Sequence, residues 1–236
     1  VLDEFHERSL EIDLALGMLQ RIRTSLRPEL RLLVMSATLS PEPIAQFLGD
    51  AHTMISEGRS FPVDIRYSKQ ISQESIENKI VHALPKMLEE TTGHVLIFLP
   101  GIGEINRTQQ AISSCSWAED FQIHRLYGDL PAKDQDEVLC NSNVRRVILS
   151  TNVAETSLTI PGVTGVIDSG LVRTMQVDSQ IGLPKLQLES ISQASAEQRA
   201  GRAGRTSPGL CYRLWPLTVH RARPSKDAPE ITRCDF

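Results

Sequence analysis

The chain has 236 residues, of which 40% are apolar, and its formal net charge is −4. This length and apolar content suffice for one or two domains with a buried core. No apolar run approaches the roughly 18 residues that cross a bilayer, and the chain begins Val-Leu-Asp-Glu, without an initiator Met or a basic signal segment. Composition therefore favours an internal part of a soluble, cytoplasmic protein that has no membrane partner.

The charge is distributed unevenly along the chain. Residues 1–160 carry 15 basic and 22 acidic side chains, a net −7, whereas residues 161–236 carry 10 and 7, a net +3. A basic segment of this kind could contact phosphates, but a mild excess is also typical of an ordinary solvated surface. The cysteines are scattered and form no CxxC pair, which predicts free thiols and no zinc site; they are Cys115, Cys140, Cys211 and Cys234.

Short β-branched runs alternate with helical stretches through the first 170 residues, a pattern typical of a parallel sheet wrapped by helices. Pro85 lies inside one helical stretch and is expected to kink or split it. Helices are expected at residues 10–25, 76–90, 102–113 and 133–140. Strands are expected at residues 31–35, 53–56, 63–67, 94–99, 122–126, 144–150 and 163–168.

A different pattern follows residue 168. The strand-like runs 171–177 and 185–191 are separated by a spacer that contains Gly and Pro, which predicts a long β-hairpin. A helix is expected to begin near Ser195, because Ser195-x-x-Gln198 fits a capping box. A last strand is expected at 209–215, followed by an irregular tail.

The segment 58–62 contains Gly, Arg, Ser and Pro and is the best candidate for a linker. The roughly 60 residues before it hold too few strands for a doubly wound domain. We therefore expect a truncated first domain at residues 1–60, a complete second domain at 61–216, and the start of a further, truncated domain at 217–236.

The acidic pair Asp3-Glu4 directly follows a short apolar stub, and Phe5 and His6 come next. Sheets of α/β proteins place their ligand chemistry at the carboxyl ends of strands. Asp3 could hold Mg²⁺ through water, and Glu4 could orient or deprotonate an attacking water. The alternative is structural: Asp3 caps the following helix, since acidic residues favour helix N-termini.

The run Gln-Arg-Ala-Gly-Arg-Ala-Gly-Arg occupies residues 198–205. On a helix, Gln198, Arg202 and Arg205 share one face, and Arg199 is turned about 100° away. The two glycines would each cost roughly 1 kcal/mol relative to alanine, which the close approach of a phosphate or another domain would justify. Arginine suits a bidentate grip on phosphate; a plain basic surface helix is the alternative.

Three polar or glycine-containing segments follow other predicted strands. Residues 150–157 crowd hydroxyl and amide groups that can bind phosphate oxygens without adding charge, and a capped helix start is the alternative. Residues 36–38 have the same position after a strand and the same alternative. Gly101 ends the third segment, residues 98–101, and is expected to open the turn into the next helix.

These segments occur in an order that resembles the DEAH/RHA helicases of superfamily 2 over essentially the whole chain. DEFH at 3–6 is similar to motif II, SAT at 36–38 to motif III, and VLIFLPG at 95–101 to motif IV. STNVAETSLTIPG at 150–162 is similar to motif V, and QRAGRAGR at 198–205 to motif VI. The last two together, in this order and spacing, are highly specific.

The resemblance implies an α/β fold with the C-terminal part of a first RecA-like domain and a complete second RecA-like domain, which has a parallel sheet and a protruding β-hairpin. ATP would be held between the domains, with single-stranded or partly duplex RNA or DNA lying across both, in a motor that is monomeric. Asp3 and Glu4 would serve Mg²⁺ through water, Glu4 would activate the attacking water, and His6 would link the nucleotide site to the facing domain.

The resemblance also implies roles for the remaining motif residues. The γ-phosphate would be bound by Gln198, Arg202 and Arg205, and the nucleotide would also lie near Thr156 and Ser157. The nucleic-acid backbone would be contacted by Thr38, Pro100, Gly101, Thr151 and Asn152, and Thr38 would couple hydrolysis to strand movement.

One element of the pattern is missing, since no Gly in the chain is followed by Lys and the phosphate-binding loop GxxxxGK[ST] is therefore absent. The expectation is an ATP-dependent helicase as the parent protein and no ATP turnover by this part alone. A module that only binds nucleic acid or a partner protein is the second interpretation. A metabolic P-loop-like protein is the third, and the missing Gly-Lys pair and GxGxxG motif speak against it.

Overall fold

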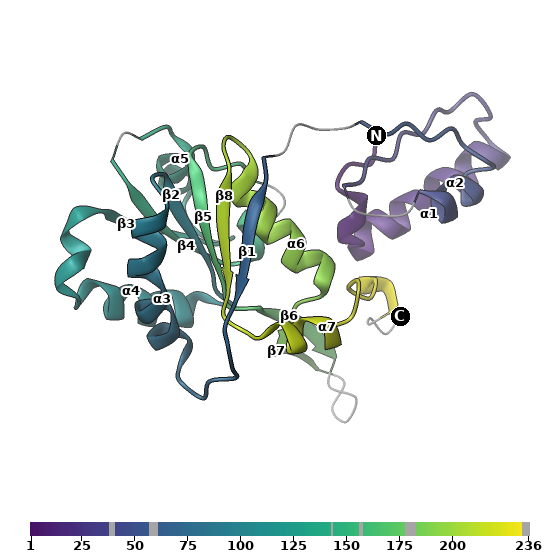
Figure 1. Cartoon of the computed structure of the whole chain (residues 1–236). Coiled ribbons are helices and arrows are strands. Elements are labelled where there is room, and N and C mark those ends of the chain that lie inside the picture. The colour runs from purple at the N-terminus through teal and green to yellow at the C-terminus, as the bar shows by residue number, and fades with distance from the viewer. Residues whose placement is uncertain (38–40, 57–60, 143, 156–157, 178–182, 233–236) are drawn as a thin grey trace. The chain divides into compact units, whose positions relative to one another are not determined.

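The computed structural model describes the chain except for residues 38–40, 57–60, 143, 156–157, 178–182 and 233–236 (Figure 1). It divides into two compact units. Unit 1 comprises Val1–Gly58, Gln176–Lys185 and Ala228–Phe236, and unit 2 comprises Arg59–Met175 and Leu186–Asp227. The domain bounds expected at residues 60 and 216 stay predictions.

Unit 1 is built around the helix α1 (Leu10–Ser25), with α2 (Glu42–Phe47) and the 3₁₀ turns η1 (Phe5–Glu7) and η5 (Glu230–Thr232). Helix α1 has the predicted bounds, and Ser9 caps it because its Oγ accepts a hydrogen bond from the N–H of Ile12. The buried core of unit 1 consists of Phe5, Leu16 and Leu48.

The two strands expected in this unit are not formed as predicted. The run 31–35 is reduced to a single parallel bridge between Leu2 and Val34. The prediction of a strand at 53–56 is wrong, since these residues are irregular and Met54 and Ile55 are 86% and 83% exposed. An apolar run becomes a strand only where neighbouring strands satisfy its backbone groups.

Unit 2 contains a six-stranded sheet in the order β1-β8-β5-β2-β4-β3, and every neighbouring pair is parallel. All five residues of β2 and of β4 are buried, as expected for central strands that are covered on both faces. The predicted α/β class with a parallel sheet is confirmed. The strands are β1 (Val63–Tyr67), β2 (His94–Phe98), β3 (Gln122–Leu126), β4 (Arg146–Ser150), β5 (Val163–Asp168) and β8 (Gly209–Arg213).

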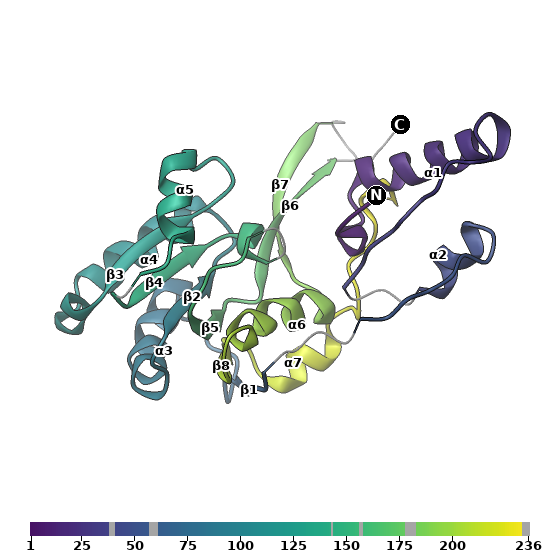
Figure 2. The same ribbon diagram turned by 90° about the horizontal axis from the view of Figure 1, so that it is seen from above.

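Helices cover both faces of this sheet (Figure 2). One face packs against α3 (Ile76–Glu90) and α4 (Ile102–Ser113), and the other against α5 (Ala132–Leu139) and α6 (Gln193–Gly201). The alternation along β2 shows why: Val95 and Ile97 enter the α3/α4 core, whereas Leu96 and Phe98 enter the α5/α6 core. Short 3₁₀ turns complete the unit: η2 (Ser116–Asp120), η3 (Asn152–Ala154) and η4 (Arg202–Gly204).

Helix α3 runs unbroken through Pro85, so the predicted split is wrong. Ser75 caps its start by accepting from the N–H of Asn78. Ile80, Leu84 and Met87 are buried against the sheet, and this packing outweighs the one backbone hydrogen bond that a proline removes. Within the described residues, no helix has the length and apolar content to cross a bilayer.

The predicted hairpin is present as β6 (Leu171–Val177) and β7 (Pro184–Ser190). Two predictions beyond it are wrong. Ser192, not Ser195, caps α6, because its Oγ accepts from the N–H of Ser195 at 3.1 Å and Ser195 already lies in the first turn. The tail is not irregular throughout, since α7 (Leu217–Ala222) follows Pro216 and packs Val219 near Trp215.

The buried His94 predicts a pH dependence of stability. Its Nδ1 accepts from the N–H of Arg146 at 3.2 Å, and burial, with the positive charges of Arg146 and Arg145 and with His124, lowers the pKa of His94 below its ordinary 6.5. Between the folded pKa and 6.5 the unfolded chain binds more protons. The stabilisation is therefore complete above pH 6.5 and is lost as the pH falls toward the folded pKa.

We expect the free energy of unfolding, measured by urea denaturation, to decrease between pH 7.5 and 5.5. His94→Asn keeps an acceptor near Nδ1 but does not titrate, so its decrease should be smaller. Burial also lowers the pKa values of His124 and His220, which remain in both proteins. Identical pH slopes for the two proteins would show that His94 is not the titrating group.

Candidate functional site

The acidic motif of unit 1 lies where an extended segment turns. The N–H of Leu2 donates to Leu33 O at 2.8 Å, and the N–H of Phe5 donates to Met35 O at 3.0 Å. Burial of Phe5 in the core leaves Asp3 exposed and Glu4 half-buried. The hydrogen bonds hold the carboxylates beside the end of the segment that precedes residues 36–38.

Glu4 has a left-handed backbone, with φ 51° and ψ 36°. A residue with a side chain pays on the order of 1–3 kcal/mol for this conformation, which is common at functional sites. Asp3 does not cap α1, since Ser9 does; instead Asp3 Oδ1 accepts from the N–H of Glu4 at 2.8 Å. The capping alternative for Asp3 is therefore wrong.

His6 connects Glu4 to the segment at 36–38. Its side chain is 4% exposed, its Nδ1 accepts from the N–H of Ala37 at 3.2 Å, and its Nε2 lies 3.3 Å from Glu4 Oε2. Because Nδ1 accepts, a neutral ring carries its proton on Nε2, the nitrogen that lies beside the Glu4 carboxylate. The imidazole thus orients Glu4. Thr38 lies outside the described residues.

The basic motif of unit 2 is not one continuous helix. Helix α6 ends at Gly201, and Arg202–Gly204 form the 3₁₀ turn η4. The shared face expected for Gln198, Arg202 and Arg205 stays a prediction. A Cβ on Gly204 would lie 2.6 Å from Phe61 O, and the N–H of Phe61 donates to Gly204 O at 2.8 Å. This glycine is therefore required by the unit's own backbone.

Two of the predicted arginines bind the segment that resembles motif V. Arg202 is 6% exposed, and its Nε and Nη1 donate to Glu155 O and Leu158 O, each at 2.8 Å; its Nη2 also donates to Glu155 O. Arg205 is exposed, and its Nη1 donates to Thr159 Oγ1. Gln198 is half-buried on α6. The structure brings motifs V and VI together, and Thr156 and Ser157 lie outside the described residues.

Arg199, which the helical pattern turns away from the predicted face, is the most buried of the three arginines in the run 198–205. It is 1% exposed; Nε donates to Glu155 Oε2 at 2.8 Å and Nη1 to Asp168 Oδ1 at 3.0 Å. Desolvation lowers the pKa of Arg199, but the charges of Asp168 and Glu155 outweigh it and raise the pKa. Asp168, at the end of an apolar strand, is the sequence signal that could have identified this pair.

The predicted nucleic-acid contacts of unit 2 follow strands at the carboxyl edge of its sheet. Phe98 is in register with Ser150 on one side and Asp168 on the other, so the residues that follow these strands share that edge. Asn152 is exposed there and Thr151 is half-buried, whereas Pro100 and Gly101 are buried. Gly101 caps α4, as expected, and a Cβ on it would lie 2.9 Å from Arg173 Nε on β6.

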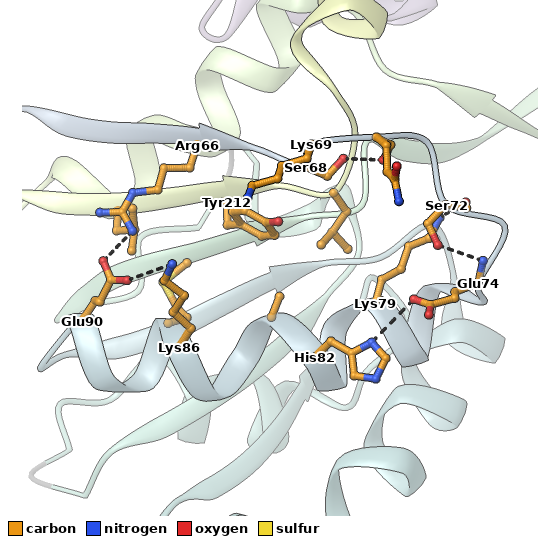
Figure 3. Close-up of a pocket in the computed structure, with 15 residues that line it drawn as sticks. Arg66, Ser68, Lys69, Ser72, Glu74, Lys79, His82, Lys86, Glu90 and Tyr212 are labelled. Atoms are coloured by element: carbon orange, nitrogen blue, oxygen red, sulfur yellow. Dashed lines mark hydrogen bonds and ion pairs between the residues drawn. The ribbon is translucent and has the colours of Figure 1, made fainter.

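A cavity of about 390 Å³ lies on the face of the sheet that α3 covers, between α3 and the strands β1 and β8 (Figure 3). Two ion pairs line it: Arg66 lies 2.5 Å from Glu90, and His82 lies 3.6 Å from Glu74. The residues predicted from the motifs do not line it. The cavity is therefore distinct from the candidate site.

The residues in unit 1 fit one mode of magnesium binding. Among the described residues, no group of three or more His, Cys, Asp or Glu side chains is placed to hold a metal ion directly. Mg²⁺ commonly binds one or two carboxylates and completes its shell with water and phosphate oxygens. Asp3 and Glu4 fit that mode.

Comparison with known proteins agrees with these motifs. Residues 78–207 match the family described as the helicase conserved C-terminal domain, which is more than half of the chain. The whole chain is 42% identical to the ATP-dependent RNA helicase HrpB of Escherichia coli and covers 29% of it. It is 38% identical to the ATP-dependent RNA helicase HrpA of Escherichia coli, and again the whole chain aligns, covering 18% of that protein.

A crystal structure of the Escherichia coli DEAH/RHA helicase HrpB superimposes with a TM-score of 0.89 at 41% identity, over 98% of this chain and 30% of that one. The chain thus spans less than a third of the length of the relatives that it matches. It belongs to the helicase conserved C-terminal domain family and, within it, is of the DEAH/RHA type.

Proposed function

We propose that the chain forms part of the motor of an ATP-dependent helicase that moves along and unwinds nucleic acid. The observation that carries the proposal is the set of hydrogen bonds by which Arg202 and Arg205 hold Glu155, Leu158 and Thr159. These hydrogen bonds join the segment that we propose binds phosphate to the segment that we propose contacts a nucleic-acid strand. The relatives are ATP-dependent RNA helicases, so RNA is the substrate that we propose.

The nucleotide would be ATP with Mg²⁺. Asp3 and Glu4 would hold the metal through water, and the metal, when bound, would neutralise charge on the phosphates. Gln198, Arg202 and Arg205 would bind the γ-phosphate, with Thr156 and Ser157 near the nucleotide. Support comes from chemistry: the carboxylates suit a hard cation, and guanidinium groups suit phosphate oxygens.

The side chains of unit 1 would move the proton. Glu4 would accept it from the attacking water, and His6, whose Nε2 lies 3.3 Å from Glu4 Oε2, would keep the carboxylate oriented. His6 also accepts from the backbone of Ala37. A shift of residues 36–38 would therefore change the orientation of Glu4, a route by which Thr38 would couple hydrolysis to strand movement.

The nucleic-acid backbone would be contacted at the carboxyl edge of the sheet. Asn152, which is exposed, and Thr151 would donate hydrogen bonds to phosphate oxygens. Pro100 and Gly101 are buried, so they would shape this edge and take part through their neighbours. Contacts of this kind predict binding that is largely independent of sequence and sensitive to salt.

The test uses the full-length protein that carries this chain. We expect ATP hydrolysis to be stimulated by single-stranded RNA of any sequence, and the stimulation to weaken as salt rises from 50 to 200 mM, by about tenfold or more. Single-stranded DNA of the same sequence serves as the matched probe for the choice of substrate. Unstimulated hydrolysis at every salt concentration would contradict the proposal.

We also propose a cytoplasmic location and a monomeric motor. Among the described residues, Cys115, Cys140 and Cys211 are free thiols, as is usual in a reducing compartment. Each proposed contact with ATP and nucleic acid comes from a single chain. A stable dimer in solution would contradict the monomeric part alone.

A further inference from the structure

Arg199 joins segments that lie far apart in the sequence of unit 2. Its guanidinium binds Glu155 Oε2 at 2.8 Å, Asp168 Oδ1 at 3.0 Å and Leu171 O at 3.3 Å. It also lies 4.9 Å from the centre of the Phe98 ring. Leu171 is the first residue of β6, so one buried side chain connects Glu155 with the base of the hairpin.

Glu155 is held at two points by two different arginines. Its carboxylate accepts from Arg199, and its backbone oxygen accepts from Nε and Nη2 of Arg202. Arg202 is one of the residues proposed to bind phosphate. If Arg202 turns to a phosphate, the backbone of Glu155 loses its donors, and the displacement reaches the carboxylate that Arg199 holds.

A second buried arginine, Arg223, also holds the base of the hairpin. Arg223 Nη1 donates to Gly170 O and to Ile191 O, both at 2.8 Å, and its guanidinium stacks 4.3 Å from the Trp215 ring. Gly170 has φ 73°, and a Cβ on it would lie 2.5 Å from Arg223 Nη2. Arg223 therefore ties the residue before β6 to the residue after β7, and Arg199 adds a separate contact to the first residue of β6.

The hydrogen bonds around Arg199 depend on one another because the groups that make them are buried. Asp168 is fully buried; its Oδ1 accepts from Arg199 and from the N–H of Gly170, and its Oδ2 has no hydrogen-bond partner among the described residues. A buried charge that loses a partner is not compensated by water. Loss of Glu155 from this cluster must therefore change how Arg199 holds Asp168 and Leu171.

We propose that Arg199 is a positioning residue that transmits displacement of Glu155 to the base of the β6–β7 hairpin. This rests on the proposed function, because it makes the binding of phosphate by Arg202 the event that displaces Glu155. The hairpin then pivots about Gly170 and Ile191, the two residues that Arg223 holds. The simpler interpretation is an ion pair that only stabilises the fold, and it predicts equal losses in every activity.

The main variant for the test is Glu155→Ala in the full-length protein. It removes the carboxylate from Arg199, leaves the Asp168 pair, and keeps the backbone oxygen that Arg202 binds. Glu155→Gln is a milder second variant in case the first does not fold. Glu197→Ala is the matched control, since Glu197 Oε1 lies 2.9 Å from another buried arginine, Arg213, which does not contact the hairpin in the described structure.

Two readouts separate positioning from stability. The first is hydrogen–deuterium exchange of peptides that cover residues 171–176 and 185–190, with and without the non-hydrolysable analogue AMP-PNP and Mg²⁺. The second is the number of base pairs unwound for each ATP hydrolysed. We expect the analogue to change exchange at the hairpin in the wild-type and Glu197→Ala proteins but not in Glu155→Ala. The base pairs unwound for each ATP should fall about two- to thirty-fold in Glu155→Ala alone.

The outcomes distinguish this inference from the proposed function. No ATP hydrolysis by the wild-type protein overturns the proposed function and this inference with it. Hydrolysis with an unchanged unwinding ratio in Glu155→Ala, or with the same exchange response as the wild type, overturns the role of Arg199 alone. If Glu155→Ala and Glu197→Ala both lose hydrolysis and unwinding in parallel, the ion pairs serve stability alone. That result also overturns the proposed role of Arg199.

Discussion

Replacing Arg205 with alanine in the full-length protein should lower stimulated ATP hydrolysis by about 10³–10⁵-fold, the range that an arginine finger supplies in related phosphoryl transfer. Arg205 is exposed and donates a hydrogen bond from Nη1 to Thr159 Oγ1. The melting temperature should therefore stay within about 2 °C of the wild type. Steady-state kinetics with saturating RNA would place the loss in kcat, because the charge that the arginine stabilises develops in the transition state.

The same change at Arg202 would be a poorer test. Arg202 is buried and donates to Glu155 O and Leu158 O, so its removal leaves backbone carbonyls without donors as well as removing a charge. Arg221→Ala is the better control, because Arg221 is an exposed arginine on α7 of the same unit. Wild-type turnover in Arg205→Ala, with Arg221→Ala also normal, would exclude Arg205 from the reaction.

Replacing Glu4 with glutamine should lower kcat by about 10²–10⁴-fold, the range that general base catalysis contributes. In the wild-type protein, Glu4 Oε2 lies 3.3 Å from His6 Nε2. Glutamine keeps an oxygen that can occupy this position, so the local structure should persist. The KM for ATP should change little, since Asp3 keeps its carboxylate and the glutamine keeps an oxygen that can bind the water around the metal. Pre-steady-state hydrolysis would separate the chemical step from product release.

Glu11→Gln provides the matched control, because Glu11 is an exposed glutamate of the following helix and loses the same charge. It should hydrolyse ATP at the wild-type rate. Equal losses in the two variants would indicate a general effect of charge in unit 1. Full activity in Glu4→Gln would remove Glu4 from the proposed mechanism.

Local patterns predicted most helices and the strands of unit 2, but not the strands of unit 1. The helices α1, α3 and α4 have the expected bounds, since apolar periodicity and the N-cap residues Ser9, Ser75 and Gly101 act within one or two turns. The runs 31–35 and 53–56 have strand composition as well, but pairing requires neighbours that composition does not specify. The hairpin was predictable because its two strands and its turn residues are contiguous.

By itself, the sequence determined the α/β class, the order of the motifs and their family, because these depend on residue types at short, fixed spacings. Only the tertiary structure decided what each arginine of the motif at 198–205 does. Close packing of Gly204 on Phe61 accompanies the end of α6 at Gly201, and Arg202 and Arg205 bind the segment that resembles motif V. Arg199 became the buried link because Asp168, 31 residues earlier, meets it inside the fold, and such a long-range pairing of charges is created by folding rather than by any local repeat.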